Sequence, residues 1–67
     1  MSAATLWMAE FDDREARRIA EDLTGKYGGD ALSYIASRAE RAVEIGDDIA
    51  QAIWRKVQAA AAELLRR

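Results

Sequence analysis

The sequence predicts an all-α fold, a three-helix arrangement built around an antiparallel helical hairpin. The 67 residues include no proline, and residues that favour helices dominate the composition. Apolar residues recur at spacings of three and four along three stretches, which is the period of an amphipathic helix. Gly-Asp pairs at 29–30 and 46–47 separate these stretches, and such residues end one helix and cap the next. We expect helices over about 12–26, 30–45 and 48–65.

The length and composition allow one small domain, which we place at 12–67. A chain of this size buries only a small core. The free energy gained by burying apolar surface is then little more than the conformational entropy cost of ordering the chain. With no cysteine and no histidine, neither a disulfide nor a Cys/His zinc site stabilises it. A monomer is therefore marginal, and self-association or docking on a larger partner is the usual remedy.

The charge balance gives no general reason to expect a nucleic-acid partner. The net charge is −2 at pH 7, and acids lie among the bases of the second predicted helix. No stretch approaches the roughly 18 apolar residues of a membrane span, so we expect no span. The N-terminus lacks the basic and apolar regions of a secretory signal, and we expect a cytoplasmic protein.

Residues 1–11 are expected to form an N-terminal arm. Leu6, Trp7, Met8 and Phe11 form a small apolar group with no regular pattern of polar residues behind it. One interpretation is that the arm folds back and caps the helices. The other is that it is an exposed anchor for a partner, because Trp and Met are favoured at binding surfaces.

The first helix is predicted to begin at Asp12. Asp12 and Glu15 have the spacing of a capping box, in which an N-cap acceptor precedes a carboxylate by three residues. The apolar stripe covers only about 100° and suits a single neighbour. Its residues are Ala16, Ile19, Ala20, Leu23 and Tyr27. Glycines at 25, 28 and 29 surround Lys26, but the order of residues is not that of a phosphate loop, so we interpret them as helix terminators.

The second helix has two distinct sides. The wider side spans about 140° around Ala39, whose small side chain permits close approach of a neighbour while Val43 seals the edge. This side carries Ala31, Leu32, Ile35, Ala36, Ala39, Ala42 and Val43. Another side groups Tyr34, Arg38, Arg41 and Ile45. Either these residues pack on the arm while the arginines extend to water, or they form an interaction patch anchored by Arg and Tyr.

The third helix carries an apolar stripe of about 160°, wider than one neighbouring helix requires. The stripe suits packing against two helices, or against one helix and a second copy of the chain. Its residues are Ile49, Ala50, Ile53, Trp54, Val57, Ala60, Ala61, Leu64 and Leu65. Trp54 and Leu65 lie at the edge, where Trp54 is either a core residue with its indole N–H at the rim or a binding hot spot.

Four short patterns carry a resemblance to a known group of proteins. They are Y-G-x-x-A-x-x-Y at 27–34, R-A-x-x-A at 38–42, G-D at 46–47 and W-x-x-V at 54–57. In these patterns, a little under half the chain resembles a group of small uncharacterised bacterial helical proteins. The resemblance implies a compact helical unit, and it implies no particular activity.

The residue types exclude most catalytic chemistry, because a hydrolase or transferase needs a base, a nucleophile or a metal in an enclosed pocket. We therefore expect no enzyme, no cofactor and no metal site. The hypothesis that remains is a helical protein-interaction module, either an accessory subunit or a regulator or inhibitor that docks on a larger protein, or a chain that self-associates. A small nucleic-acid-associated helical protein is the alternative. The candidate partner-binding residues are Trp7, Phe11, Tyr34, Arg38, Arg41, Ile45, Trp54 and Leu65.

Overall fold

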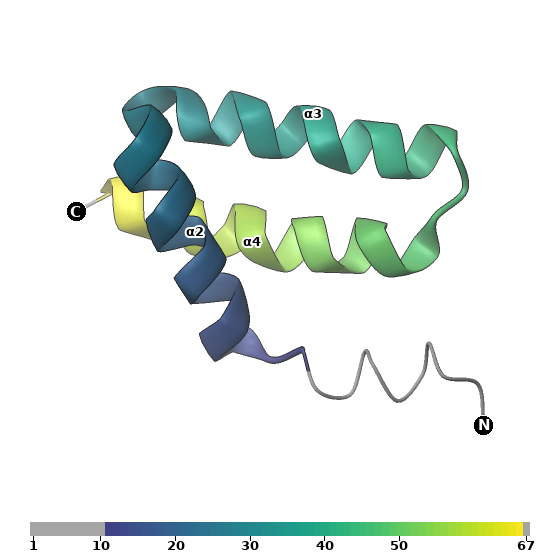
Figure 1. Ribbon diagram of the computed structural model, residues 1–67, viewed down its shortest axis with the longest axis horizontal. Coiled ribbons are helices and arrows are strands. Elements are labelled where there is room, and N and C mark those ends of the chain that lie inside the picture. The colour runs from purple at the N-terminus through teal and green to yellow at the C-terminus, as the bar shows by residue number, and fades with distance from the viewer. Residues whose placement is uncertain (1–10, 67) are drawn as a thin grey trace.

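The computed structural model describes residues 11–66, and this part of the chain is almost entirely helical (Figure 1). Helix α2 spans Asp13–Tyr27, the 3₁₀ turn η1 spans Gly28–Asp30, α3 spans Ala31–Glu44 and α4 spans Asp48–Arg66. No strand occurs in the described residues, which confirms the all-α class. The helix bounds differ from the expected ones by one residue or less at each end. Apart from Phe11, the predicted N-terminal arm lies outside the described residues.

The chain bends between α2 and α3 at Gly28, which leaves the helical conformation where the 3₁₀ turn begins. Gly28 has φ 60° and ψ −131°, and its N–H donates to the Thr24 carbonyl. The Ala31 N–H then donates to the Gly28 carbonyl, so α3 follows directly from the 3₁₀ turn. Asp30 makes no capping bond through its side chain. The expected break at the Gly-Asp pair is therefore a tight bend, and only Gly28 of the glycines there requires a positive φ.

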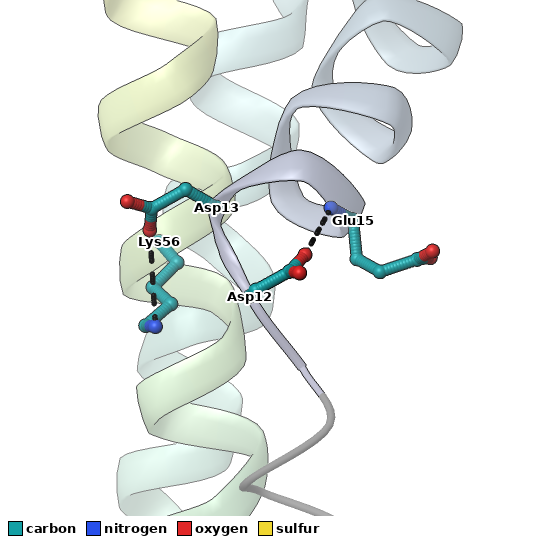
Figure 2. A network of polar contacts seen from close by, with 4 residues as sticks. All are labelled: Asp12, Asp13, Glu15 and Lys56. Atoms are coloured by element: carbon teal, nitrogen blue, oxygen red, sulfur yellow. Dashed lines mark hydrogen bonds and ion pairs between the residues drawn. The ribbon is translucent and has the colours of Figure 1, made fainter.

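The first turn of α2 is fixed by two aspartates (Figure 2). Asp12 is the N-cap, and its Oδ1 accepts a hydrogen bond of 3.0 Å from the Glu15 N–H. Asp13 forms an ion pair of 3.8 Å with Lys56 of α4. The Glu15 carboxylate points away from Asp12, so the cap works in one direction only. Since both partners of the ion pair are exposed, the N-cap contributes more to stability than the ion pair does.

The link between α3 and α4 is a Schellman motif followed at once by an N-cap. Gly46, at φ 71°, donates its N–H to the Val43 carbonyl at 3.1 Å. The Asp47 N–H donates to the Ala42 carbonyl at 2.9 Å, which is the second bond of the motif. Asp47 also caps α4, because its Oδ1 accepts from the Ala50 N–H at 3.0 Å. This short link turns the chain so that α4 lies alongside α3 (Figure 1).

Within the described residues, α4 is the helix that packs extensively against both of the others. Figure 1 shows α3 alongside α4, while α2 crosses the C-terminal half of α4. The buried core joins α2, α3 and α4, and among residues 11–66 its large, fully buried side chains are Ile35 and Val57. The other members of this core cluster are Ala16, Ala20 and Ala61. Partly buried residues surround it, namely Phe11, Ile19, Leu23, Leu32, Tyr34, Ile53, Trp54, Ala60 and Leu64.

Helix α3 is rotated relative to the orientation expected from its sequence. Its buried residues are Ala31, Ile35 and Ala42, whereas Ala39 is half-buried and Val43 is 56% exposed. At 100° per residue, the centre of the buried side lies about 60° from Ala39. The prediction that Val43 seals the interface is therefore wrong. The rotation brings Tyr34 to the edge of the core, where it contacts Trp54 of α4.

The glycines allow a matched test of this backbone geometry. We expect Gly46→Ala to lower the free energy of unfolding by about 1–2 kcal/mol, because the left-handed conformation is unfavourable for a residue with a Cβ. Gly25→Ala, within α2 and with nothing within 4 Å of its added Cβ, should raise that free energy by about 0.5–1 kcal/mol. Urea denaturation followed by circular dichroism measures both. If both variants changed the free energy of unfolding by the same amount in the same direction, the left-handed conformation assigned to Gly46 would be contradicted.

Candidate functional site

Three aromatic rings, one from each described α-helix, meet around Tyr34. The Tyr27 ring at the end of α2 stacks on Tyr34 with a centroid distance of 4.9 Å and an interplanar angle of 21°. Trp54 of α4 meets Tyr34 edge to face at 6.4 Å and 75°. Such pairs contribute about 0.5–1.5 kcal/mol each beyond the area they bury. Tyr34 therefore connects the bend, α3 and α4, and its ring is held in place by the fold.

Two cations lie over these rings on the solvent side. The Arg38 Cζ is 5.3 Å from the Tyr34 ring centroid, and its Nε donates to the Tyr34 hydroxyl at 3.3 Å. The Lys26 Nζ is 5.4 Å from the centroid of the Tyr27 ring. Arg38 follows Tyr34 by one helical turn, so the contact is a consequence of helical spacing. The result is a cluster that alternates aromatic and cationic groups at the surface.

The same side of α3 continues from this cluster to the end of the helix. Arg41 and Ile45 follow Tyr34 and Arg38 at helical spacing, and Arg41 pairs with Glu44 at 3.6 Å. Both members of that pair are exposed, so it contributes less than about 1 kcal/mol. Ile45 is 61% exposed, although it is a large apolar residue. We call the surface formed by Tyr27, Tyr34, Arg38, Arg41 and Ile45 the aromatic–basic face.

A second surface lies on the other side of α3. There a shallow groove runs between α3 and α4, and we call it the α3–α4 groove. Alanines and the exposed Val43 form its α3 wall, while polar side chains form its α4 wall. The lining residues are Ala36, Ala39, Glu40, Val43, Gln51, Arg55 and Gln58.

A second hollow lies between α2 and α4 and is partly open to solvent. Its lining mixes basic and acidic side chains, and two of them, Asp13 and Lys56, already pair with each other. The mixture of signs selects neither an anion nor a cation. We therefore build no site on this hollow.

The structure brings together some of the predicted site residues and separates others. Tyr34, Arg38 and Trp54 are in contact, and Arg41 and Ile45 extend the same side of α3. Phe11 is half-buried against the core. Leu65 is 38% exposed near the C-terminal end of α4, far along that helix from the link to α3. Trp7 lies outside the described residues.

Tyr27 of the aromatic–basic face and all the residues that line the α3–α4 groove, Val43 among them, were not among the predicted site residues. Tyr27 was assigned to the stripe of the first helix, yet it stacks on Tyr34 across the bend. The seven-residue spacing of the two tyrosines does not by itself indicate this contact, because the bend at Gly28 determines where Tyr27 lies relative to α3. Val43 was assigned to the core, and it is exposed because α3 is rotated. Both residues thus depend on geometry that local patterns do not determine.

The described residues include no group of three or more His, Cys, Asp or Glu side chains placed to hold a metal ion. None of the helices described here is both long enough and apolar enough to cross a membrane. Comparisons with protein-family models, curated proteins and solved structures found no match to this chain. The resemblance of the hairpin patterns to small bacterial helical proteins stays a prediction.

Two variants of Tyr34 separate the contribution of its ring from that of its hydroxyl. Tyr34→Phe keeps the stacking and removes one exposed hydrogen bond to Arg38, so we expect a loss of less than about 0.5 kcal/mol in unfolding free energy. Tyr34→Ala removes the ring contacts to Tyr27 and Trp54 and should cost about 2–3 kcal/mol. Thermal or urea unfolding measures both values. Similar losses in the two variants would show that the rings do not stabilise the junction.

Proposed function

We propose that the protein is a small helical protein-interaction module that docks on a larger protein through its aromatic–basic face. In this proposal it acts in the cytoplasm as an accessory subunit or as a regulator or inhibitor. The observation that carries the proposal is the 61% exposure of Ile45 at the end of a side of α3 that also presents Arg38 and Arg41. An exposed large aliphatic residue beside arginines and tyrosines has the composition of a binding hot spot.

The exposure of the Ile45 side chain has no explanation in the packing of residues 11–66. Ile45 is the C-cap of α3, and the Schellman bonds there run between main-chain groups of neighbouring residues. The side chain is thus not needed to end the helix, and its exposure leaves apolar surface in water. Covering Ile45 with a partner would remove that surface from water.

The contacts around Tyr34 favour binding because they order the face before a partner arrives. Stacking with Tyr27 and the edge contact with Trp54 hold the Tyr34 ring, and the hydroxyl accepts a hydrogen bond from Arg38. Side chains that are already ordered lose less entropy on binding. The face therefore offers a rigid aromatic centre with cationic and apolar groups beside it.

The proposal takes as its unit a three-helix arrangement in which α3 and α4 form an antiparallel hairpin and α2 is the third helix. Tyr27 of the face comes from α2 and Tyr34 from α3, and Trp54 of α4 contacts the Tyr34 ring, so all three helices contribute to the order of the face. The cations of the face are Arg38 and Arg41, Lys26 lies over its Tyr27 ring, and the neighbouring Glu44 is paired with Arg41. A partner surface that combines acidic and apolar groups fits this chemistry.

A nucleic-acid partner is the alternative, and the geometry supports it less well. Binding of single-stranded nucleic acid uses aromatic faces on which bases stack. The Tyr34 ring is already stacked on Tyr27 and carries the Arg38 guanidinium. Its faces are thus occupied by the protein's own groups.

Surface variants of the full-length chain test the proposal. Arg41→Glu and Ile45→Asp change exposed side chains of the aromatic–basic face, and Glu21→Arg on exposed α2 surface is the control for charge reversal. Affinity capture from the native host with quantitative mass spectrometry should recover the same protein with the wild type and with the control. The variants Arg41→Glu and Ile45→Asp should recover at least about tenfold less of that protein. The reason is that charges buried against a partner weaken binding strongly.

Equal recovery by all four proteins, or no reproducible recovery, would overturn the proposed function. Circular dichroism melting of each variant shows that its helices are intact. Fluorescence anisotropy with single- and double-stranded oligonucleotides tests the alternative. Binding that weakens steeply with salt, and that Arg41→Glu reduces, would favour a nucleic-acid partner.

A further inference from the structure

We propose that the α3–α4 groove binds a second copy of this chain, forming a dimer with two-fold symmetry. The groove lies on the opposite side of α3 from the aromatic–basic face, so this inference does not depend on the proposed docking function. A dimer formed in this way leaves the aromatic–basic face of each copy open to another partner.

The apolar part of the groove is open to close approach by another helix. Ala36 and Ala39 are half-buried and Val43 is 56% exposed, and within the described residues α2 packs elsewhere, against the C-terminal half of α4. Small side chains at these positions allow helix axes to approach at the short end of the usual range of about 8–10 Å. The exposed valine supplies the volume that the alanines lack.

The charges at the groove are complementary to themselves. Glu40 stands on the α3 wall and Arg55 on the α4 wall, and both are exposed. Neither has an ion-pair partner among residues 11–66. In a two-fold interface each contact occurs twice, so Glu40 of one copy can meet Arg55 of the other, and the reverse. One acid on one wall and one base on the other is the simplest charge pattern that can pair with a second copy of itself.

The remaining polar residues of the groove fit the same symmetry. Gln51 and Gln58 are two helical turns apart on α4 and lie on either side of Arg55 along the wall. Each amide has both donors and acceptors, so a glutamine can pair with a glutamine of the other copy. Every polar side chain on the α4 wall of one copy therefore has a complementary side chain on the groove of the other copy.

A second copy fits the groove better than the chain's own residues 1–10 do. Those residues carry one charged side chain, Glu10, which has the sign to pair with Arg55, and no basic side chain to pair with Glu40. The core also gives a reason for dimerisation, because its only large, fully buried side chains among the described residues are Ile35 and Val57. Burying Val43 and the alanines against another copy would extend this small core across the interface.

Charge reversal provides a direct test in the full-length protein. Sedimentation equilibrium over a range of concentrations should show a dimer for the wild type. Glu40→Arg and Arg55→Glu should each raise the dimer Kd roughly tenfold or more, because like charges then face each other. The double variant Glu40→Arg/Arg55→Glu should return the Kd close to that of the wild type, and Glu21→Arg should leave it unchanged.

Three results would overturn the dimer. One is a wild type that is monomeric at every concentration, and another is a double variant that dimerises as weakly as the single variants. The third is a dimer that Ile45→Asp dissociates while both groove reversals leave it intact, which would place self-association on the aromatic–basic face. Purified protein alone suffices for this experiment, so its failure is distinct from failure of the capture experiment. Melting curves confirm that each variant is folded.

Discussion

The packing of Val57 and Ala61 determines how the described helices are arranged. Both residues lie on α4 and are fully buried, and they meet alanines of α2 as well as Ile35 of α3. Helices α2 and α3 contact each other much less than either contacts α4. Each therefore keeps its position chiefly by packing on α4. The helices start and stop where the caps at Asp12 and Asp47 and the Schellman motif at Gly46 place their ends. The packing around Val57 and Ala61 on α4 determines how they assemble.

A core made largely of alanine has consequences for the surface. Alanine allows helices to approach closely, but it buries little apolar area per residue. Larger side chains such as Tyr34 and Trp54 are therefore left half-buried at the rim, where they pack on the core and still reach solvent. The two sides of α3 differ for the same reason. One side has aromatic and cationic groups that contact each other, while the other side contributes mostly small residues to the wall of the α3–α4 groove.

Much of the helical organisation could be predicted from the sequence, because caps and helix terminators act over a few residues. Asp12, Asp47 and Gly46 behave as their residue types indicate. The rotation of α3 was not predictable in this way, since an apolar side of about 140° containing several alanines is compatible with several orientations. Ile35 is fully buried while Ala39 is only half-buried, and in this orientation Tyr34 meets Trp54 across helices. The Tyr27 contact likewise depends on the bend at Gly28. Of the candidate sites, the sequence indicated Tyr34, Arg38, Arg41 and Ile45 of the aromatic–basic face, but neither Tyr27 nor the α3–α4 groove.

The claim that α4 organises the assembly is tested most directly by amide hydrogen exchange followed by NMR. The slowest-exchanging amides should lie in α4 around Val57–Ala61 and in α3 around Ile35, with protection approaching the global free energy of unfolding. The first turn of α2 and the residues flanking Gly46 should exchange faster through local opening. If α3 or α2 retained protection while the middle of α4 exchanged rapidly, the account of the fold would be contradicted.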